Sequence, residues 1–156
     1  RRYLAEFLDK EVARAERDHT PVTVVIMDVD NFKAFNDTYG HKCGDVILQS
    51  ITNFLIEHSR RGDVVCRYGG EEFVILMPNA SLETGFERAE MWRQDFSESV
   101  LEYEDMKLSA TFSAGVATFP QHGATGDAIL QAADKALYKS KDAGKNRVTS
   151  FDKQFV

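Results

Sequence analysis

Three acidic side chains follow segments that are apolar or rich in glycine, and together they have the chemistry of a cation site. Asp28 ends an apolar run, and Glu71 and Glu72 follow the pair Gly69-Gly70. If the segment ending at Asp28 and the glycine-containing hairpin are neighbouring strands, these carboxylates converge at one edge of a sheet. Clustered carboxylates repel one another unless a hard cation lies between them, and magnesium fills its remaining positions with water and phosphate oxygens.

The glycine pair suits the approach of a phosphate group. A residue without a Cβ lets phosphate oxygens reach the backbone and permits positive φ in a tight turn. Each feature also has a purely structural interpretation, because an Asp after a strand is often a helix cap, Gly-Gly a turn, and Glu-Glu a solvated pair. Their joint occurrence favours a site for metal and phosphate.

The elements that position these residues follow from the hydrophobic periodicity. Helices are predicted over 4–15, from Asp30 or Asn31 as cap through Phe35, from Gly44-Asp45 to a stop at Gly62, over 82–96 and over 128–141. Strands are predicted over 22–27, 64–66, 73–77, 108–119 as one long or two short strands, and 147–151. Irregular alternation with a hairpin in the middle favours an α+β fold, a sheet covered by helices, over a doubly wound parallel sheet.

The composition describes one globular domain. With 156 residues, 43% of them hydrophobic, the chain can bury a core without disulfides or a structural metal. A net charge of -6 argues against binding to a nucleic-acid polymer, because that affinity comes mainly from Lys and Arg. Cys43 and Cys66 have no metal or redox spacing and are expected to be reduced thiols in a cytoplasmic protein. No apolar run approaches the roughly 20 residues that span a bilayer, so this domain is expected to make no membrane contact.

Three blocks of the sequence resemble the GGDEF family of diguanylate cyclases, in the family's order and spacing. The stretch 67–73, Arg-Tyr-Gly-Gly-Glu-Glu-Phe, is similar to the signature in its variant with Glu at the third position, GGEEF. The run 28–45 resembles the family's first strand and nucleotide-binding helices, and 133–146 resembles its closing helix and turn. The resemblance implies a single domain over 1–156, excised from a longer signalling protein that upstream segments could anchor in a membrane. It implies a palm-like, ferredoxin-like or nucleotidyl-cyclase-type fold with a mostly antiparallel central sheet flanked by helices.

The resemblance also implies an activity and a metal site. Diguanylate cyclases condense two GTP into cyclic di-GMP and release two pyrophosphates. Asp28 and Glu71 would hold Mg²⁺, or Mn²⁺ as a substitute, with the Val29 carbonyl as a further ligand. Glu72 would support the site or help remove the proton from the attacking 3′-hydroxyl.

The GTP contacts are implied in the same way. Asn36 and Asp45 would read the guanine edge, which suits a carboxylate because guanine offers an N–H and an amine that adenine lacks. Lys141 would meet the terminal phosphates beside Lys145, which replaces the Arg of most relatives and should bind triphosphate more weakly without the bidentate fork. From the residues alone, both lysines would be assigned to a solvated helix end. The other implied substrate contacts are Phe32, Lys33, His41, Gly69 and Gly70.

Two further expectations concern assembly and control. One domain holds one GTP, so the reaction requires a homodimer of facing domains, driven by upstream modules. The segment Arg60-Arg61-Gly62-Asp63 is an RxxD pattern at the position of an inhibitory product site, with Arg60 and Asp63 as its core. Met91 falls where some relatives supply another arginine. The structural alternative is that these arginines complement a helix dipole.

Two other functions stay open at this point. The first is a non-catalytic signalling domain that binds GTP or cyclic di-GMP, although such relatives commonly lose the signature residues that are intact here. The second is a different nucleotidyl cyclase or polymerase-like enzyme on the same palm. Asp45 argues against it, since relatives that accept ATP tend to alter this position.

Overall fold

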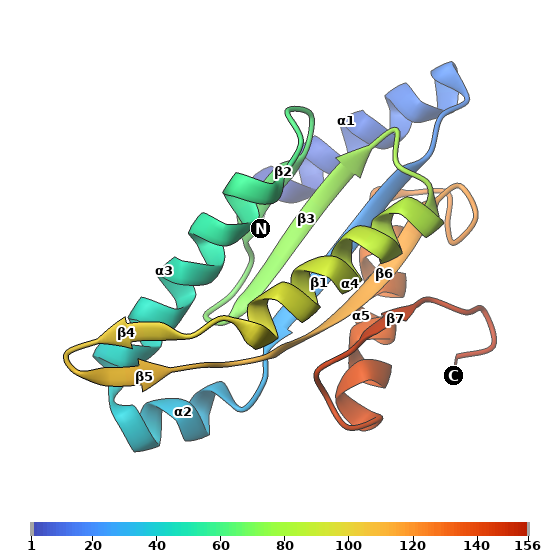
Figure 1. The fold of residues 1–156 in the computed structure, drawn as a ribbon. Coiled ribbons are helices and arrows are strands. Elements are labelled where there is room, and N and C mark those ends of the chain that lie inside the picture. The colour runs from blue at the N-terminus through green and yellow to red at the C-terminus, as the bar shows by residue number, and fades with distance from the viewer. Residues whose placement is uncertain (1, 156) are drawn as a thin grey trace.

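The central sheet is built from the apolar runs of the chain. In the computed structural model, which describes residues 2–155, the strands β1 (Val22–Val29), β3 (Glu72–Pro78) and β6 (Phe112–Phe119) are almost wholly buried. Such continuous runs, rather than alternating ones, are typical of strands covered on both faces. With β2 (Val64–Arg67) and β7 (Val148–Ser150) they form a five-stranded sheet in the order β2-β3-β1-β6-β7. Only the β6–β7 pair is parallel (Figure 1).

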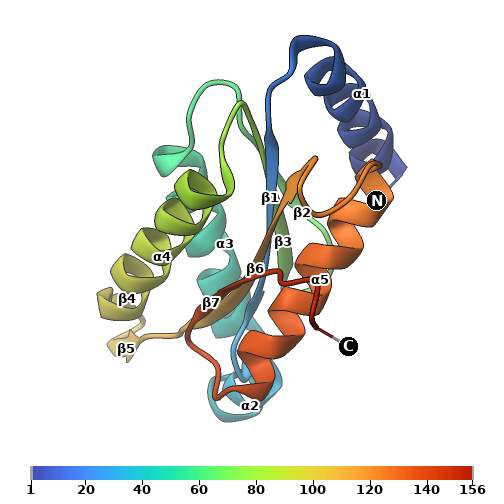
Figure 2. The ribbon, with the colours of Figure 1, turned by 90° about the vertical axis from the view of Figure 1, so that its right-hand side faces the viewer.

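Four helices cover the two faces of this sheet. The helices α1 (Arg2–Asp18) and α5 (Gly126–Asp142) pack on the face to which Val24 and Ile26 of β1 point. The helices α3 (His41–His58) and α4 (Leu82–Glu98) pack on the face of Val25 and Met27. Figure 2 shows the sheet between these two helical layers. The short helix α2 (Phe32–Tyr39) follows β1 at one end of the sheet.

A close approach of α5 to β6 fixes the position of α5 against the sheet. A Cβ on Gly115 of β6 would lie only 2.1 Å from the Ala133 carbonyl oxygen and 2.2 Å from the Leu137 nitrogen of α5. The Ser140 hydroxyl donates to the Ala114 carbonyl at 2.8 Å. These contacts hold the C-terminal turn of α5 against the sheet, beside the end of β1.

The predicted α+β fold with a mostly antiparallel sheet and flanking helices is confirmed. Several boundaries were wrong. α3 begins at His41, because the chain turns at Gly40 with φ of 90°, and it ends at His58, before Gly62. The predicted capping of α2 is absent, since Asn31 at its N-cap makes no side-chain cap bond.

The region 108–119 contains parts of two strands, which was one of the two expected arrangements, but the hairpin that precedes β6 was not predicted. Its strands β4 (Leu101–Tyr103) and β5 (Met106–Leu108) form a separate two-stranded sheet, so Leu108 does not belong to β6. The turn residues Glu104 and Asp105 both have positive φ, which side chains other than glycine seldom adopt. Within residues 2–155, no helix combines the length and the apolar character that crossing a membrane requires.

Candidate active site

The end of β1 brings the acidic residues of the two motifs together. Asp28 lies directly opposite Glu72 of β3 and opposite Ser113 of β6. The Val29 amide donates to the Glu71 carbonyl at 3.2 Å, so the signature segment lies beside the end of β1. Paired residues on neighbouring strands point to the same face, which places the Asp28 and Glu72 side chains on the α1–α5 face. Asp28, Glu71 and Glu72 therefore share one end of the sheet.

A lysine from the other end of the sequence lies among these acids. The Lys141 ammonium is 2.8 Å from Asp28 Oδ1 and 2.9 Å from Asp30 Oδ1. It also lies 3.3 Å from the Asp28 carbonyl oxygen and 3.5 Å from that of Val29. Burial lowers the pKa of Lys141, but the hydrogen bonds and charges of the two aspartates outweigh burial and raise it above its ordinary value. The site therefore contains a positive charge that the acidic residues of the motifs do not reveal.

The donor set suits a hard divalent cation. Burial, and then the charge of Asp28, raise the pKa of Glu71, while Lys141 lowers it in part. A cation beside both carboxylates would relieve this repulsion. Among residues 2–155, no group of three or more His, Cys, Asp or Glu side chains is arranged to hold a metal. The metal-binding role of Asp28 and Glu71 therefore stays a prediction. Two carboxylates with a backbone carbonyl still match the way Mg²⁺ is commonly held beside phosphates.

Asp30 connects three segments beneath this site, a role that the sequence reasoning missed. Its side chain is 2% exposed. It accepts hydrogen bonds from the Thr111 hydroxyl at 2.7 Å, the Ser113 hydroxyl at 2.6 Å, the Asn146 amide at 2.9 Å and the Lys141 ammonium. Burial alone would raise the pKa of Asp30, but the bonds from Lys141, Ser113 and Thr111 hold it below its ordinary value. Asp30 thus orders the end of β1, the start of β6 and the turn after α5.

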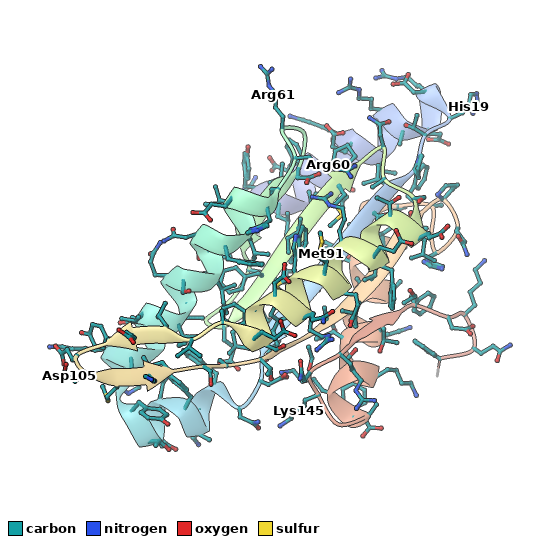
Figure 3. All side chains as sticks on the ribbon, in the orientation of Figure 1. His19, Arg60, Arg61, Met91, Asp105 and Lys145 are labelled. Atoms are coloured by element: carbon teal, nitrogen blue, oxygen red, sulfur yellow. The ribbon has the colours of Figure 1, made fainter. Side chains whose placement is uncertain are left out.

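The turn after α5 brings a second lysine to the start of α2. Gly144, Lys145 and Asn146 all have positive φ, which reverses the chain tightly. The Lys145 ammonium donates to Asn31 Oδ1 at 2.6 Å, and Figure 3 shows Lys145 at the end of the molecule where α2 and α5 meet. Two cationic side chains and the free amides of the first turn of α2 thus lie near each other, an arrangement that suits phosphate.

A buried acceptor lies between α2 and α3. Asn36 Oδ1 has no hydrogen-bond partner among the described residues, although it is shielded from water. A Cβ on Gly44 of α3 would lie 1.9 Å from this oxygen and 3.1 Å from Phe32 Cζ, so glycine leaves the space that Asn36 occupies. Asp45, the next residue of α3, is exposed. Because buried acceptors are nearly always paired, Asn36 Oδ1 is suited to accept from a donor on a ligand.

The two core residues of the RxxD pattern share one turn, but their side chains have different surroundings. The Arg60 side chain is exposed at the turn between α3 and β2, near Arg61 in Figure 3. The Asp63 side chain is 5% exposed, and Asp63 Oδ2 accepts from Arg88 Nη2 at 2.6 Å and from the Arg60 amide at 2.8 Å. Met91 of α4 is 52% exposed. The arginine that reaches Asp63 is therefore Arg88, one turn of α4 before Met91.

The remaining predicted substrate contacts lie on α2, on α3 and in the loop between β2 and β3. Lys33 and His41 are exposed, at the first turn of α2 and the start of α3. Gly69 and Gly70 are in the loop between β2 and β3, where the Gly70 carbonyl accepts from the Arg67 guanidinium at 2.6 Å. This bond holds the glycine loop beside the end of β2.

Comparison with known proteins places these features in a family. The family model described as "Diguanylate cyclase, GGDEF domain" matches residues 1–147. The diguanylate cyclase DgcP of Pseudomonas aeruginosa is 40% identical over 145 residues, which are 93% of this chain and 22% of that protein. The response regulator PleD of Caulobacter vibrioides is 39% identical over 150 residues, 95% of this chain and 33% of that protein. The chain thus spans about a third or less of the length of these relatives.

Solved structures agree over nearly the whole chain. The active GGEEF domain of a diguanylate cyclase from Vibrio cholerae superposes with a TM-score of 0.91 at 32% identity, covering 99% of this chain and 97% of that one. The GGDEF domain of DgcB from Caulobacter crescentus in complex with c-di-GMP gives a TM-score of 0.87 at 32% identity, covering 93% of this chain and 86% of that one.

Proposed function

The chain belongs to the family of diguanylate cyclase GGDEF domains, and from this premise we propose that it joins two GTP into cyclic di-GMP and releases two pyrophosphates. The observation that carries the proposal is the end of β1, where the charges of Asp28 and Glu71 interact beside the Lys141 ammonium. We assign the chain to the GGEEF variant from its residues 69–73, the motif by which the active Vibrio cholerae domain is named.

Asp28, Glu71 and the Val29 carbonyl are the proposed holders of Mg²⁺, with Mn²⁺ as a substitute. When bound, such an ion supplies charge neutralisation at the α-phosphate and acidifies the attacking 3′-hydroxyl. The raised pKa of Glu71 supports this assignment, because burial and the like charge of Asp28 disfavour its charged form and a cation between the two carboxylates would favour it. Glu72, on the same face as Asp28, is proposed to support the site or to take the proton of the 3′-hydroxyl.

The nucleotide is proposed to lie between the α2–α3 pair and the two lysines. Asn36 Oδ1, buried without a partner among the described residues, would accept from a guanine donor, and the exposed Asp45 carboxylate would accept from the others. This pair of acceptors favours guanine over adenine.

The phosphate end of the nucleotide has its own set of proposed contacts. Lys141 and Lys145 supply positive charge. The proposed backbone and surface contacts are Phe32, Lys33, His41, Gly69 and Gly70. Together these groups hold the α-phosphate in position for in-line attack, and positioning is most of what a protein contributes to phosphoryl transfer.

The reaction requires two copies of the domain. Each holds one GTP, and the 3′-hydroxyl on one domain attacks the α-phosphate on the other. A homodimer is therefore the proposed active form, and dimerisation controls the rate.

Product inhibition is proposed at the RxxD turn. Arg60 has an exposed guanidinium that can bind a phosphate of cyclic di-GMP bidentately. Asp63, although held by Arg88, fixes the backbone amide of Arg60 and so the shape of the turn. Replacing Arg60 with Ala should relieve inhibition by added product in the turnover assay, and unchanged inhibition would reject this site.

A turnover assay tests the proposed activity. The chain fused to a dimerising coiled coil should convert GTP with Mg²⁺ to cyclic di-GMP, and should leave ATP unchanged. Glu71→Gln should abolish product formation, while Glu83→Gln, an equal change of charge at an exposed residue of α4, should not. A dimer that binds GTP and metal yet forms no product would instead support a non-catalytic receptor.

A further inference from the structure

The Lys141 ammonium contacts two of the three groups proposed to hold the metal. It lies 2.8 Å from Asp28 Oδ1 and 3.5 Å from the Val29 carbonyl oxygen. A Mg²⁺ ion would bind the same kinds of oxygen at about 2.1 Å. Two cations that share these oxygens would lie a few ångströms apart, where like charges repel strongly.

We propose that Lys141 is the resident cation of the nucleotide-free site, and that it competes with the divalent metal for Asp28 until the triphosphate binds. This inference rests on the proposed metal site at Asp28, Val29 and Glu71. It assigns Lys141 a positioning role in the nucleotide-free protein, in addition to its proposed contact with phosphate.

Asp30 provides the second anchor that makes such an exchange feasible. It is buried and is held by Thr111, Ser113 and the Asn146 amide as well as by Lys141. Asp30 therefore keeps its place whether or not Lys141 also touches Asp28. The Lys141 side chain is 24% exposed, so the ammonium can turn towards a phosphate while it keeps its bond to Asp30.

The consequence is that metal and nucleotide should bind cooperatively. Without nucleotide, the metal must displace the Lys141 ammonium from Asp28, and this competition weakens the binding of the metal. With nucleotide, the phosphates accept the ammonium and leave Asp28 to the metal. The site therefore binds metal weakly when no nucleotide is present. Lys141 keeps the carboxylates of Asp28 and Asp30 close together when no metal is bound.

The test is calorimetric titration of the nucleotide-free chain with Mn²⁺. Lys141→Met should tighten Mn²⁺ binding about five- to tenfold, as expected for removal of one adjacent and partly exposed charge. Lys145→Met is the matched control, because it removes an equal charge whose ammonium donates to Asn31 Oδ1, which is not one of the proposed metal ligands. Lys145→Met should change the affinity for Mn²⁺ less than about twofold, because salt screens the interaction between charges that are not in contact.

The outcomes separate this inference from the proposed function. If Asp28→Asn and Glu71→Gln weaken Mn²⁺ binding but Lys141→Met leaves it unchanged or weakens it, the resident-cation role is wrong and the metal site stands. If none of the three changes alters Mn²⁺ binding, the metal site itself is wrong.

A second measurement needs no variant and covers the case in which Lys141→Met does not fold. A crystal of the unmodified chain soaked in Mn²⁺ should show the Lys141 ammonium moved away from Asp28 and still bonded to Asp30. An ammonium that stays on Asp28 Oδ1 beside a bound ion would overturn the proposal.

Discussion

Exchanging Asp30 for Asn should destabilise the domain strongly, although the two side chains have the same shape. Asp30 Oδ1 accepts from Ser113 and Lys141, and Oδ2 accepts from Thr111 and the Asn146 amide. Asparagine offers one acceptor oxygen and one amino group that only donates. Whichever way its amide turns, the amino group faces either the ammonium or the backbone N–H, and neither can accept. The two hydroxyl groups can adapt, so the conflict is limited to one position.

The magnitude follows from these contacts. A hydrogen bond to a charged group contributes roughly 1.5–3 kcal/mol, and a buried charge left without its partner costs about 3–5 kcal/mol. Because Lys141 keeps Asp28 as a second partner, we expect the free energy of unfolding to fall by about 2–4 kcal/mol. Urea denaturation followed by circular dichroism measures this change. Thr111→Val, which removes one of the hydrogen bonds to the charged Asp30 carboxylate and leaves the Lys141 contact in place, should cost about 1.5–3 kcal/mol.

Asp30→Asn should also change how the stability of the domain depends on pH. The pKa of Asp30 is lower in the folded chain than its ordinary value, so its contribution is present above about pH 4 and is lost as pH falls further. The Asn variant should therefore lose less stability than the parent between neutral pH and pH 3. A variant within about 0.5 kcal/mol of the parent, with the same acid dependence, would refute the assigned role of Asp30.

Three further predictions concern the nucleotide pocket, the RxxD turn and the far end of the sheet. Gly44→Ala should raise the KM for GTP at least about tenfold, because its Cβ would collide with Asn36 Oδ1, while kcat at saturation changes less; an unchanged KM would exclude Asn36 from the pocket. Arg88→Leu should lower the free energy of unfolding by about 3–5 kcal/mol, since it leaves the buried Asp63 carboxylate uncompensated; adding Asp63→Leu should recover part of this loss in a double-mutant cycle. Burial, then the nearby Lys153 charge, lower the pKa of His122, so stability should decline as pH falls below about 6.5. Thermal melts should show a smaller loss of stability with falling pH in His122→Gln than in the parent. An equal loss in the variant would contradict the role assigned to His122.

The sequence predicted the fold class because its apolar runs have clear lengths and periods. β1 and β6 are continuous apolar strands, and α1 and α5 carry stripes of buried residues at helical spacing. The hairpin of β4 and β5 escaped notice because its strands have only three residues each and its turn uses Glu104 and Asp105 at positive φ. The start of α3 depends on Gly40, which interrupts the backbone between two helices without interrupting the hydrophobic pattern.

Within the site, neighbours in sequence were predictable and distant partners were not. The motifs identified Asp28 and Glu71, and antiparallel pairing with β3 brings them to the same end of the sheet. Lys141 lies 113 positions from Asp28, and only the packing of α5 on β6 brings its ammonium to that carboxylate. Asp30 resembled a helix cap in sequence. Its position two residues after Asp28, just past the end of β1, was the available signal.

The Arg88–Asp63 pair shows a second kind of limit. Local spacing indicated an RxxD turn, but the exposure of its carboxylate depends on which residue of α4 faces it. Arg88 does so, and Met91 lies at the surface. The phase of a helix against a distant turn is set by the packing of the core, where Trp92 anchors α4.

The central claim is that Asp28 and Glu71 share a divalent metal with the phosphates of GTP. A crystal structure of the chain with Mg²⁺ and a non-hydrolysable GTP analogue tests it most directly. The ion should be bound by both carboxylates and by phosphate oxygens, with the guanine between α2 and α3. A structure in which the analogue binds elsewhere, or in which these carboxylates point apart with no ion between them and the phosphates, would contradict the account.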